Sequence, residues 1–271
     1  LKYMICSDLI KILEKKAPLY LAESWDNPGL LVGRRNKEIK TVLTALDVTD
    51  DVIKEAISIN ADIIVTHHPL IFGSIKSVSD STPEGRKILA LAENGICAYA
   101  MHTNLDTAFG GTNDTLAEIL GLKDIEPLAV NCQQNEMPNG LGRFGILPES
   151  MSFSDFAKMV KEKLNLNCLT IVGNKEKTIS KVGLCTGAGF EFIEEAKANG
   201  CDCYITADVK FHEAQKALNM DICLIDATHY GTENIIVPVL RDYIQNEANK
   251  AGFEITVKAS DVNGQVFDYI K

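Results

Sequence analysis

Histidines are the residues of this sequence whose positions point most directly to chemistry, and there are five of them. Four lie at or just past the carboxyl ends of segments that the sequence predicts to be buried strands: His67, His68, His102 and His229. Open α/β sheets place their ligand sites at these strand ends, and imidazole is the commonest metal ligand. The clustering therefore predicts a metal site.

The His67-His68 pair follows a predicted strand over 62–66 directly, and Pro69 stiffens the turn that comes next. Adjacent side chains on a strand point to opposite faces, but a turning backbone can direct two imidazoles to two neighbouring ions. A single histidine here would be explained as an ordinary core residue. Two in tandem after four apolar residues favour metal binding.

Each half of the chain also carries a histidine and a carboxylate spaced by four residues. His102 and Asp106 follow a predicted strand over 96–100, and His229 and Glu233 follow another near 222–226. Residues at this spacing share one face of a helical turn. One such pair alone is typical of a cap or a surface contact, but its recurrence after equivalent strands favours a metal site.

Three or four imidazoles with two carboxylates suit Zn²⁺, Fe²⁺ or Mn²⁺ better than Ca²⁺ or Mg²⁺, which prefer oxygen ligands. The mixed set tolerates all three metals, so the sequence does not choose among them. It is large enough for two ions bridged by a carboxylate, about 3.5–4 Å apart, a centre that lowers the pKa of a bound water. Hydrolysis is the chemistry that such a centre predicts.

The elements that must position these residues repeat along the chain. Strands are expected at 41–46, 62–66 and 96–100 with helices at 50–59 and 83–94, and again at 181–185, 202–206 and 222–225 with helices at 190–199 and 210–218. A helix over 6–17, a helix over 235–251 and a strand over 253–259 complete the pattern. The strands are apolar without alternation, as in a parallel sheet covered on both faces.

The two halves align at a shift of 140 residues, where Val42 meets Val182 and Asp62 meets Asp202. Internal duplication explains this agreement, with chance similarity between two βαβ segments as the alternative. We therefore expect an α/β protein with a first half over 1–130 and a second half over 151–271 that packs in part with the chain start. The polar, turn-rich stretch between them, 131–150, is expected to be a linker.

Composition narrows the function classes. Lys and Arg number 27 against 37 Asp and Glu, and the net charge of −10 argues against nucleic acid as a partner. No apolar run reaches the roughly 18 residues of a membrane span, so a soluble, cytoplasmic protein without a signal peptide is expected. The eight cysteines form no CxxC pair, which is typical of reduced thiols, although Cys201 and Cys203 would share a strand face and form part of a soft-metal site.

Several residues near these segments have two interpretations. Asp26 is placed either to hydrogen-bond the site or to cap its own turn, and Trp25 either to pack or to stack on a substrate. The segment 187–189, Gly-Ala-Gly, is a tight turn or a backbone surface for an anion. Asp208 and His212 either line the cleft or belong to an ordinary helix start.

Four motifs, in order over residues 24–233, resemble the Nif-three-like dinuclear-metal proteins, many of which are named GTP cyclohydrolase I type 2 homologues. They are Ser24-Trp25-Asp26-Asn27, Thr66-His67-His68-Pro69, His102-Thr103-Asn104-Leu105-Asp106 and His229-Tyr230-Gly231-Thr232-Glu233. The resemblance implies two divalent metal ions per chain. It implies metal ligands at His67, His68, Asp106, His229 and Glu233, with Glu233 or Asp106 bridging, and it places His102 beside them, either as a group that contacts the ligands or as an acid–base residue.

The resemblance also implies a fold of two similar, intertwined three-layer α/β/α halves with the metal site between them, assembled as a toroidal homohexamer. The family name implies a hydrolase that acts on a nucleotide or related small molecule, with a metal-activated water as the nucleophile. Two alternatives are a non-enzymatic, hexameric metal-binding scaffold or regulator, and a nucleotide phosphoesterase. The chain contains no GxxxxGK[ST] loop.

Overall fold

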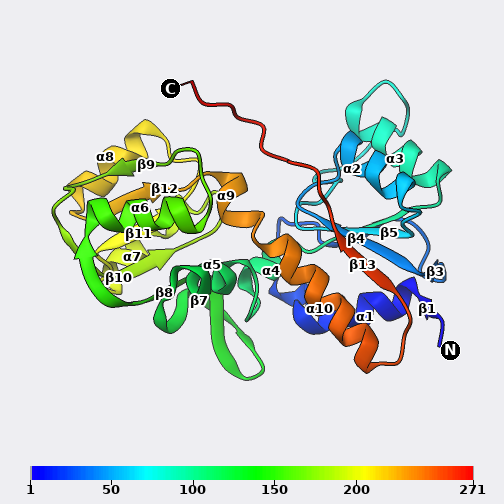
Figure 1. Ribbon diagram of the computed structural model, residues 1–271, viewed down its shortest axis with the longest axis horizontal. Helices are drawn as coiled ribbons and strands as arrows, with labels where there is room; N and C mark the ends of the chain where they lie inside the picture. The colour runs from blue at the N-terminus through cyan, green and yellow to red at the C-terminus, as the bar shows by residue number, and fades with distance from the viewer. Residues whose placement is uncertain (1, 271) are drawn as a thin grey trace. The chain divides into compact units, whose positions relative to one another are not determined.

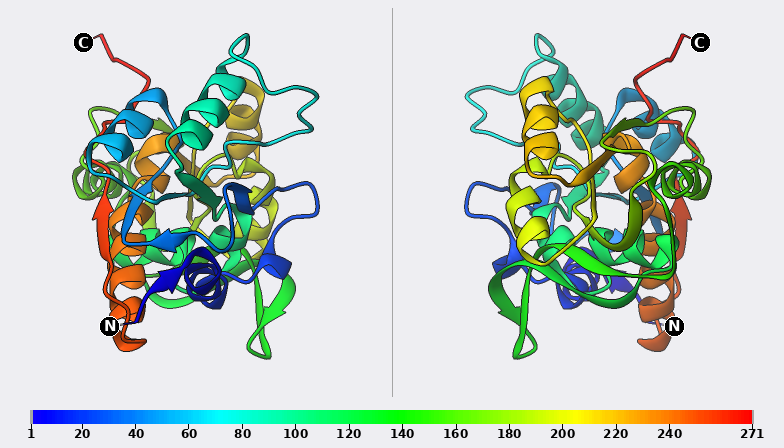
Figure 2. Two further views of the ribbon diagram at one scale, coloured as in Figure 1. Left: turned by 90° about the vertical axis from the view of Figure 1, so that its right-hand side faces the viewer. Right: turned by 90° about the vertical axis from the view of Figure 1, so that its left-hand side faces the viewer.

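The computed structural model describes residues 2–270, which divide into two compact units (Figures 1 and 2). Unit 1 comprises the residues up to Leu105 together with Ile236–Gly264, and unit 2 comprises Asp106–Ile235 together with the residues from Gln265 onward. The chain thus leaves unit 1, builds unit 2 and returns, at boundaries other than the expected 130 and 151. Within residues 2–270, no helix is long and apolar enough to span a membrane.

Unit 1 is built on a five-stranded sheet. Its elements are β1 (Met4–Ile5), α1 (Cys6–Lys16), η1 (Leu19–Leu21), β2 (Gly29–Val32), β3 (Glu38–Ile39), β4 (Thr41–Ala45), α2 (Asp50–Ser58), β5 (Ile63–Thr66), α3 (Pro83–Glu93), β6 (Cys97–Ala100), α10 (Ile236–Lys250) and β13 (Thr256–Ala259). The strand order is β13-β4-β5-β6-β2, with the first four parallel and β2 antiparallel to β6. The short strands β1 and β3 pair separately.

Helices cover both faces of the unit 1 sheet (Figure 1). On one face, Leu43 and Ile64 pack against the apolar sides of α2 and α3. On the other, the Thr44 hydroxyl donates to the Val237 carbonyl of α10 at 3.1 Å. The result is a three-layer α/β/α unit in which the central strands β5 and β6 are buried at every residue, as the unbroken apolar runs predict.

Unit 2 carries a six-stranded sheet. Its elements are α5 (Thr112–Leu120), β7 (Lys123–Gln134), β8 (Met137–Ser152), α6 (Phe153–Lys163), β9 (Thr170–Val172), β10 (Thr178–Leu184), η2 (Phe190–Phe192), α7 (Ile193–Ala198), β11 (Cys203–Thr206), α8 (Phe211–Asn219), β12 (Cys223–Asp226) and α9 (His229–Glu233), and α4 (Thr103–Thr107) spans the boundary. The order is β7-β8-β10-β11-β12-β9, and only β10, β11 and β12 are parallel to one another.

Unit 2 is also three-layered, which confirms the predicted α/β/α architecture. One apolar cluster joins the sheet to Phe156 of α6 and to α5, and a second joins it to Ile193 of α7 and to α8. Cys203 belongs to the first cluster and Cys201 to the second. These two thiols therefore lie on different sides of the sheet, and the idea that they share a face was wrong.

One hydrogen-bonding device occurs in both units. The Asp62 Oδ2 atom accepts from the N–H groups of Lys40 and Thr41, at 2.7 and 3.0 Å. Asp202 Oδ2 accepts from the N–H groups of Ser180 and Lys181, both at 2.9 Å. All three positions are related by the shift of 140 residues, so the backbone supports the internal duplication.

The units exchange one helix each, which explains the intertwined chain order. Helix α5 follows β6 of unit 1 but packs with α6 in unit 2. Helix α10 follows β12 and α9 of unit 2 but packs with α1 in unit 1, where the Tyr243 hydroxyl donates to the Ile12 carbonyl at 3.1 Å. Each unit is therefore completed by a helix that continues the other unit's chain.

Residues 131–150, expected to be a linker, lie in the paired strands β7 and β8. The hairpin turns at Asn135 and Glu136, whose φ angles are 52° and 66°. Two left-handed residues in a row are the geometry of the turn that matches strand twist. The turn itself carries no Asn-Gly or Asp-Gly pair, and Asn139-Gly140 lies inside β8, so the polar composition resembled that of a loop.

Candidate metal centre and its neighbours

Three histidines of unit 1 come together at one edge of its sheet. His67 and His68 follow β5, and His102 follows the neighbouring parallel strand β6, so the strand ends meet. Their candidate ligand atoms all lie within 4.8 Å of one another, and the three rings are 5.0 to 5.7 Å apart. His67 is fully buried. The predicted cluster of imidazoles is therefore present within this unit.

Each of these imidazoles is oriented through its Nδ1 atom. The contacts are His67 Nδ1 to the Met101 carbonyl at 2.8 Å, His68 Nδ1 to Asp47 Oδ1 at 2.8 Å, and His102 Nδ1 to Asp26 Oδ1 at 2.7 Å. Carbonyl and carboxylate oxygens only accept, so each Nδ1 carries a hydrogen, and in the neutral ring Nε2 carries the lone pair. Metal-ligating histidines are held in this way, and the donor set fits a divalent transition metal.

Asp26 anchors His102 from a fully buried position, with its side chain 0% exposed. Its carboxylate also accepts from the N–H of Thr103 at 2.9 Å and from the N–H of Asn27 at 2.7 Å. Burial would raise the pKa of Asp26, but the hydrogen bonds from His102 and Thr103 outweigh it and lower the pKa to about 2. Both interpretations of Asp26 hold, because it orients a site histidine and closes its own turn.

Two aromatic side chains stand beside His102 with more than half of their surfaces exposed. Trp25 is 57% and Phe72 is 58% exposed, and their ring centroids are 5.8 Å apart. They lie 6.1 and 6.2 Å from the His102 ring, edge-on. Asn27 holds the Phe72 loop by donating to the Ile71 carbonyl at 2.7 Å. Trp25 is therefore not the buried packing residue that a lone tryptophan usually is.

Unit 2 brings together the histidine and carboxylate of α9. His229 Nε2 lies 3.0 Å from Glu233 Oε2, and His229 Nδ1 lies 2.7 Å from Asp208 Oδ2. The hydrogen bond to Glu233, aided by Asp208, raises the pKa of His229 to about 9 against the effect of burial. A proton is thus held where two candidate ligand atoms face each other, and a divalent cation would compete with it.

The backbone around α9 is shaped for this contact. Gly187 has a φ of +64°, and a Cβ there would collide with the Glu233 carboxylate. Its N–H donates to the Thr232 hydroxyl at 3.0 Å, and the Gly189 N–H donates to the Thr206 hydroxyl at 2.9 Å. These donors are used inside the protein, so segment 187–189 is a tight turn rather than an anion-binding surface.

Asp106 is a nearly buried carboxylate of unit 2, 8% exposed. Its Oδ1 atom accepts from the hydroxyls of Thr112 and Thr186. Burial, together with the charges of the Asp106 and Glu233 carboxylates, raises the pKa of the Cys185 thiol. Both carboxylates are therefore close enough to Cys185 to act on the same thiol. The two threonines, 6 and 80 positions from Asp106, were not found by sequence reasoning, since neither hydroxyl belongs to a recognisable spacing pattern.

The predicted residues thus fall into two groups. Unit 1 holds His67, His68 and His102, and unit 2 holds Asp106, His229 and Glu233. His212 lies apart on the surface, where its ring contacts Phe211 and its Nδ1 atom lies 2.9 Å from Gln215. Asp47 was missed, although its place just after a predicted strand was a usable signal.

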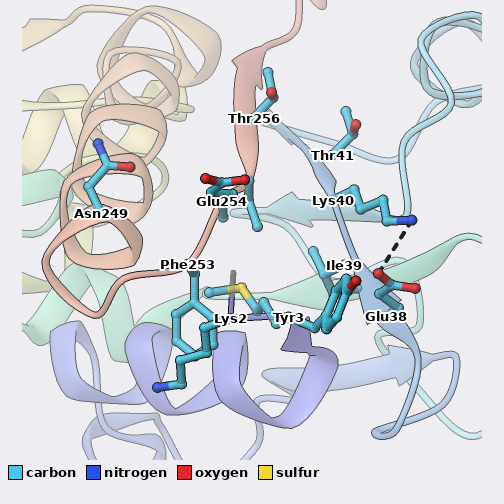
Figure 3. A pocket seen from close by; sticks show the side chains of 12 residues that line it. Lys2, Tyr3, Glu38, Ile39, Lys40, Thr41, Asn249, Phe253, Glu254 and Thr256 are labelled. Carbon is cyan, nitrogen blue, oxygen red and sulfur yellow. Dashed lines mark ion pairs between the residues drawn. The ribbon is translucent and has the colours of Figure 1, made fainter.

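A cavity of about 520 Å³ also occurs in unit 1, between β1, β3 and the turn before β13 (Figure 3). Figure 3 shows Lys40 paired with Glu38, and Lys2 lies over the Phe253 ring at 4.2 Å. None of the residues that line this cavity is a histidine or a cysteine. It is separate from the candidate metal residues and offers no comparable donor set.

Comparison with known proteins identifies the family. Residues 4–265 match the model of the Duf34/NIF3 (NGG1p interacting factor 3) family. The chain belongs to this family. A relative named GTP cyclohydrolase 1 type 2 homolog from Clostridium acetobutylicum is 37% identical over 256 residues, which cover 94% of this chain and 95% of that protein.

Solved NIF3-family structures share the fold. A Bacillus cereus protein related to NIF3 superimposes with a TM-score of 0.94 at 25% identity, over 100% of both chains. A Staphylococcus aureus protein superimposes with a TM-score of 0.92 at 32% identity, over 98% of this chain and 99% of that one. The predicted family membership is confirmed. The histidine cluster described above has a donor set that suits a metal ion.

Proposed function

We propose that this NIF3-family protein is a metal-dependent hydrolase that uses two divalent cations. His67 and His68 would supply nitrogen ligands, and Asp106, His229 and Glu233 the remaining ones, with Asp106 or Glu233 as the bridge. The observation that carries the proposal is the fixed orientation of the three unit 1 imidazoles, each with Nδ1 on an oxygen acceptor. The relatives' printed name, GTP cyclohydrolase 1 type 2 homolog, supports hydrolytic chemistry.

Divalent cations, when bound, supply Lewis acidity and lower the pKa of a coordinated water towards neutrality. The protein itself supplies acid–base chemistry through His102. His102 Nδ1 donates its hydrogen to Asp26 Oδ1 over an N–O distance of 2.7 Å, so the Nε2 atom can accept a proton and return it. Because Asp26 stays ionised above a pH of about 2, it also stabilises the charged imidazolium that this step requires.

The proposed substrate is a nucleotide or a related small molecule with a planar ring. Support comes from Trp25 and Phe72, which present exposed aromatic surface beside His102. Aromatic faces stack on planar bases, a contact worth about 1–3 kcal/mol per base. This pair therefore favours a heteroaromatic ring over a sugar or peptide near the acid–base residue.

Metal content per chain tests the centre. We expect about two ions by elemental analysis of protein purified without chelator. His68→Ala and Glu233→Ala should each lose metal, because each removes one ligand, whereas the surface control His212→Ala should retain it. Less than about half an ion per chain after reconstitution with zinc, iron and manganese would remove the proposed chemistry.

Turnover tests the reaction and separates the rival classes. A nucleotide panel would be followed by ring absorbance for ring opening and by phosphate release for phosphoester cleavage. His102→Ala should retain metal and lose roughly 10²–10⁴-fold in turnover, as expected for removal of an acid–base group. Unchanged turnover in this variant would refute its role. Fully loaded protein without turnover on any nucleotide would instead support the metal-binding scaffold.

A further inference from the structure

Two cysteines of unit 1 lie together at the end of the sheet where the strands begin. Cys6 is the first residue of α1 and Cys97 the first residue of β6, and both are buried. The Cys6 N–H donates to the Lys37 carbonyl at 2.8 Å, and the Cys97 N–H donates to the Asp62 carbonyl at 2.9 Å. Lys37 and Asp62 are themselves joined by an ion pair of 3.1 Å. This network fixes the backbone at both cysteines, and their two side chains are hydrogen-bonded to each other.

The two thiols are not equivalent. A hydrogen bond from Cys6 lowers the pKa of Cys97, and the backbone N–H of Arg34 and the charge of Lys37 act in the same direction against burial and Asp62. The same contact raises the pKa of Cys6. Cys97 is therefore the thiol that ionises more readily, and Cys6 is the thiol that holds its proton more tightly.

Cys97 also lines a cavity of about 620 Å³, together with Gly33, Arg34 and Lys37. Gly33 has a φ of +121°, and a Cβ there would collide with the Cys97 sulfur. Gly33 thus packs directly against the sulfur, with no side chain between the two. A small reactant that enters this cavity meets a thiol flanked by two cationic side chains.

Unit 2 contains a natural counterpart that lacks the second thiol. Gly173, φ +125°, packs on Cys223 as Gly33 packs on Cys97. The Phe153 N–H donates to the Lys177 carbonyl at 2.8 Å, as the Cys6 N–H does to Lys37, so Phe153 stands where unit 1 has Cys6. Burial raises the pKa of Cys223 although Lys177 lies nearby. The paired thiol is what distinguishes the unit 1 position.

We propose that Cys6 and Cys97 form a redox-active pair that a hydroperoxide converts to an intramolecular disulfide. The Cys97 thiolate attacks the hydroperoxide, an S–O bond forms as the O–O bond breaks, and the alcohol or water leaves with a proton. The Cys6 sulfur then attacks the sulfur of the Cys97 sulfenic acid and displaces hydroxide. The hydroxide takes up the Cys6 proton and departs as water. Two thiols are oxidised by two electrons, and the hydroperoxide is reduced.

The test uses the full-length protein, reduced and stripped of metal with a chelator, and hydrogen peroxide as the probe. Mass spectrometry under non-reducing conditions should show the loss of two hydrogens, mapped to a Cys6–Cys97 link. Cys223→Ser, the matched control, should form the same link. A linkage between other cysteines, or no linkage with Cys97 left as a thiol, would overturn the proposal.

Two further measurements complete the test, and the first of them needs no variant. In the unmodified protein, iodoacetamide should alkylate Cys97 roughly tenfold faster than Cys223, because only Cys97 has a lowered thiol pKa. Cys6→Ser should accumulate a sulfenic acid at Cys97 that dimedone traps, since the resolving thiol is gone. Equal alkylation rates for Cys97 and Cys223 would contradict the assignment of the reactive thiol.

Discussion

The two units repeat one backbone plan but end matching strands in different side chains. After β5 of unit 1 come His67 and His68, and at the shift of 140 residues unit 2 has Ala207 and Asp208 after β11. Both strand ends accept the same backbone hydrogen bond. The Thr66 carbonyl accepts from the Met101 N–H at 2.8 Å in unit 1, and the Thr206 carbonyl accepts from the Ala227 N–H at 2.9 Å in unit 2. The frame is therefore shared, and the chemistry resides in the side chains placed on it.

The same contact corrects one detail of the sequence comparison. It aligns Met101 with Ala227, a shift of 126 residues, so His102 corresponds to Thr228 and His229 to Thr103. The two histidine–carboxylate pairs are thus one residue out of register rather than equivalent. Thr228 lies directly before α9, where the two registers differ, and its φ of +64° is unusual for a β-branched residue.

The largest effect is expected where unit 2 departs furthest from unit 1, at the β7–β8 hairpin. Arg143 is 1% exposed, pairs with Asp114, and donates to the carbonyls of Gly140 and Thr107 at 2.8 and 3.0 Å. Arg143→Met leaves the Asp114 carboxylate without its cation. Urea unfolding should show a loss of about 3–5 kcal/mol.

The exposed pair of Arg241 and Asp242 provides the control for this prediction. Arg241→Met should change the free energy of unfolding by less than about 0.5 kcal/mol. A loss below about 1 kcal/mol in Arg143→Met would show that the hairpin is an appendage, and that the frame of unit 2 holds without it.

The hairpin also marks where sequence reasoning stopped. Strands such as β6 and β11 were predicted within a residue or two because their apolar runs are unbroken and the helices before them end in Asn-Gly. Helices α5 and α6 were missed, since α5 is completed only by packing on α6 across a long stretch of sequence. Exchange of α5 and α10 between the units has no local signal at all.

The candidate site was predictable to the extent that strand ends were. His67, His68, His102, His229, Asp106 and Glu233 were all named from their spacing after strands, and the structure gives each an oriented partner. The partners themselves were harder to find. Asp47 and Asp208 lie twenty-one positions from His68 and His229, so only the fold brings them together.

The matched aspartates give a symmetric test of the duplicated frame. Asp62→Ala and Asp202→Ala each remove two hydrogen bonds from backbone N–H groups to a carboxylate. Each should cost about 1.5–3 kcal/mol in the free energy of unfolding, and the two losses should agree within about 1 kcal/mol. Asp51→Ala, on the surface, is the control. One variant losing far more than the other would break the equivalence of the units.

The matched glycines sharpen the comparison at the cysteine positions. Gly33→Ala and Gly173→Ala both place a side chain at a φ above 120°, which should cost about 1–3 kcal/mol in thermal or urea unfolding. The Cβ of Gly173→Ala would lie 3.0 Å from the Cys223 sulfur, and the Cβ of Gly33→Ala would lie still closer to the Cys97 sulfur. Gly33→Ala should therefore show the larger loss of the two. The reverse order would contradict the close packing at Cys97.

The smallest effect concerns how each unit secures its exchanged helix. In unit 1, hydrogen bonds from Lys15 at 2.6 Å and Lys250 at 2.8 Å lower the pKa of Glu247 on α10 to about 2. A lowered carboxyl pKa adds stability above its unfolded value of 4.5, and that stability is lost as the pH falls towards 2. Glu247→Gln should therefore unfold at a lower urea concentration than the parent protein at pH 7, and the difference should shrink in acid.

Unit 2 provides the control. Lys163 of α6 donates to the Ile119 carbonyl of α5 at 2.7 Å, so the effect of Lys163→Met on urea unfolding should not change over this pH range. A pH-independent effect of Glu247→Gln would show that the two exchanged helices are held in the same way.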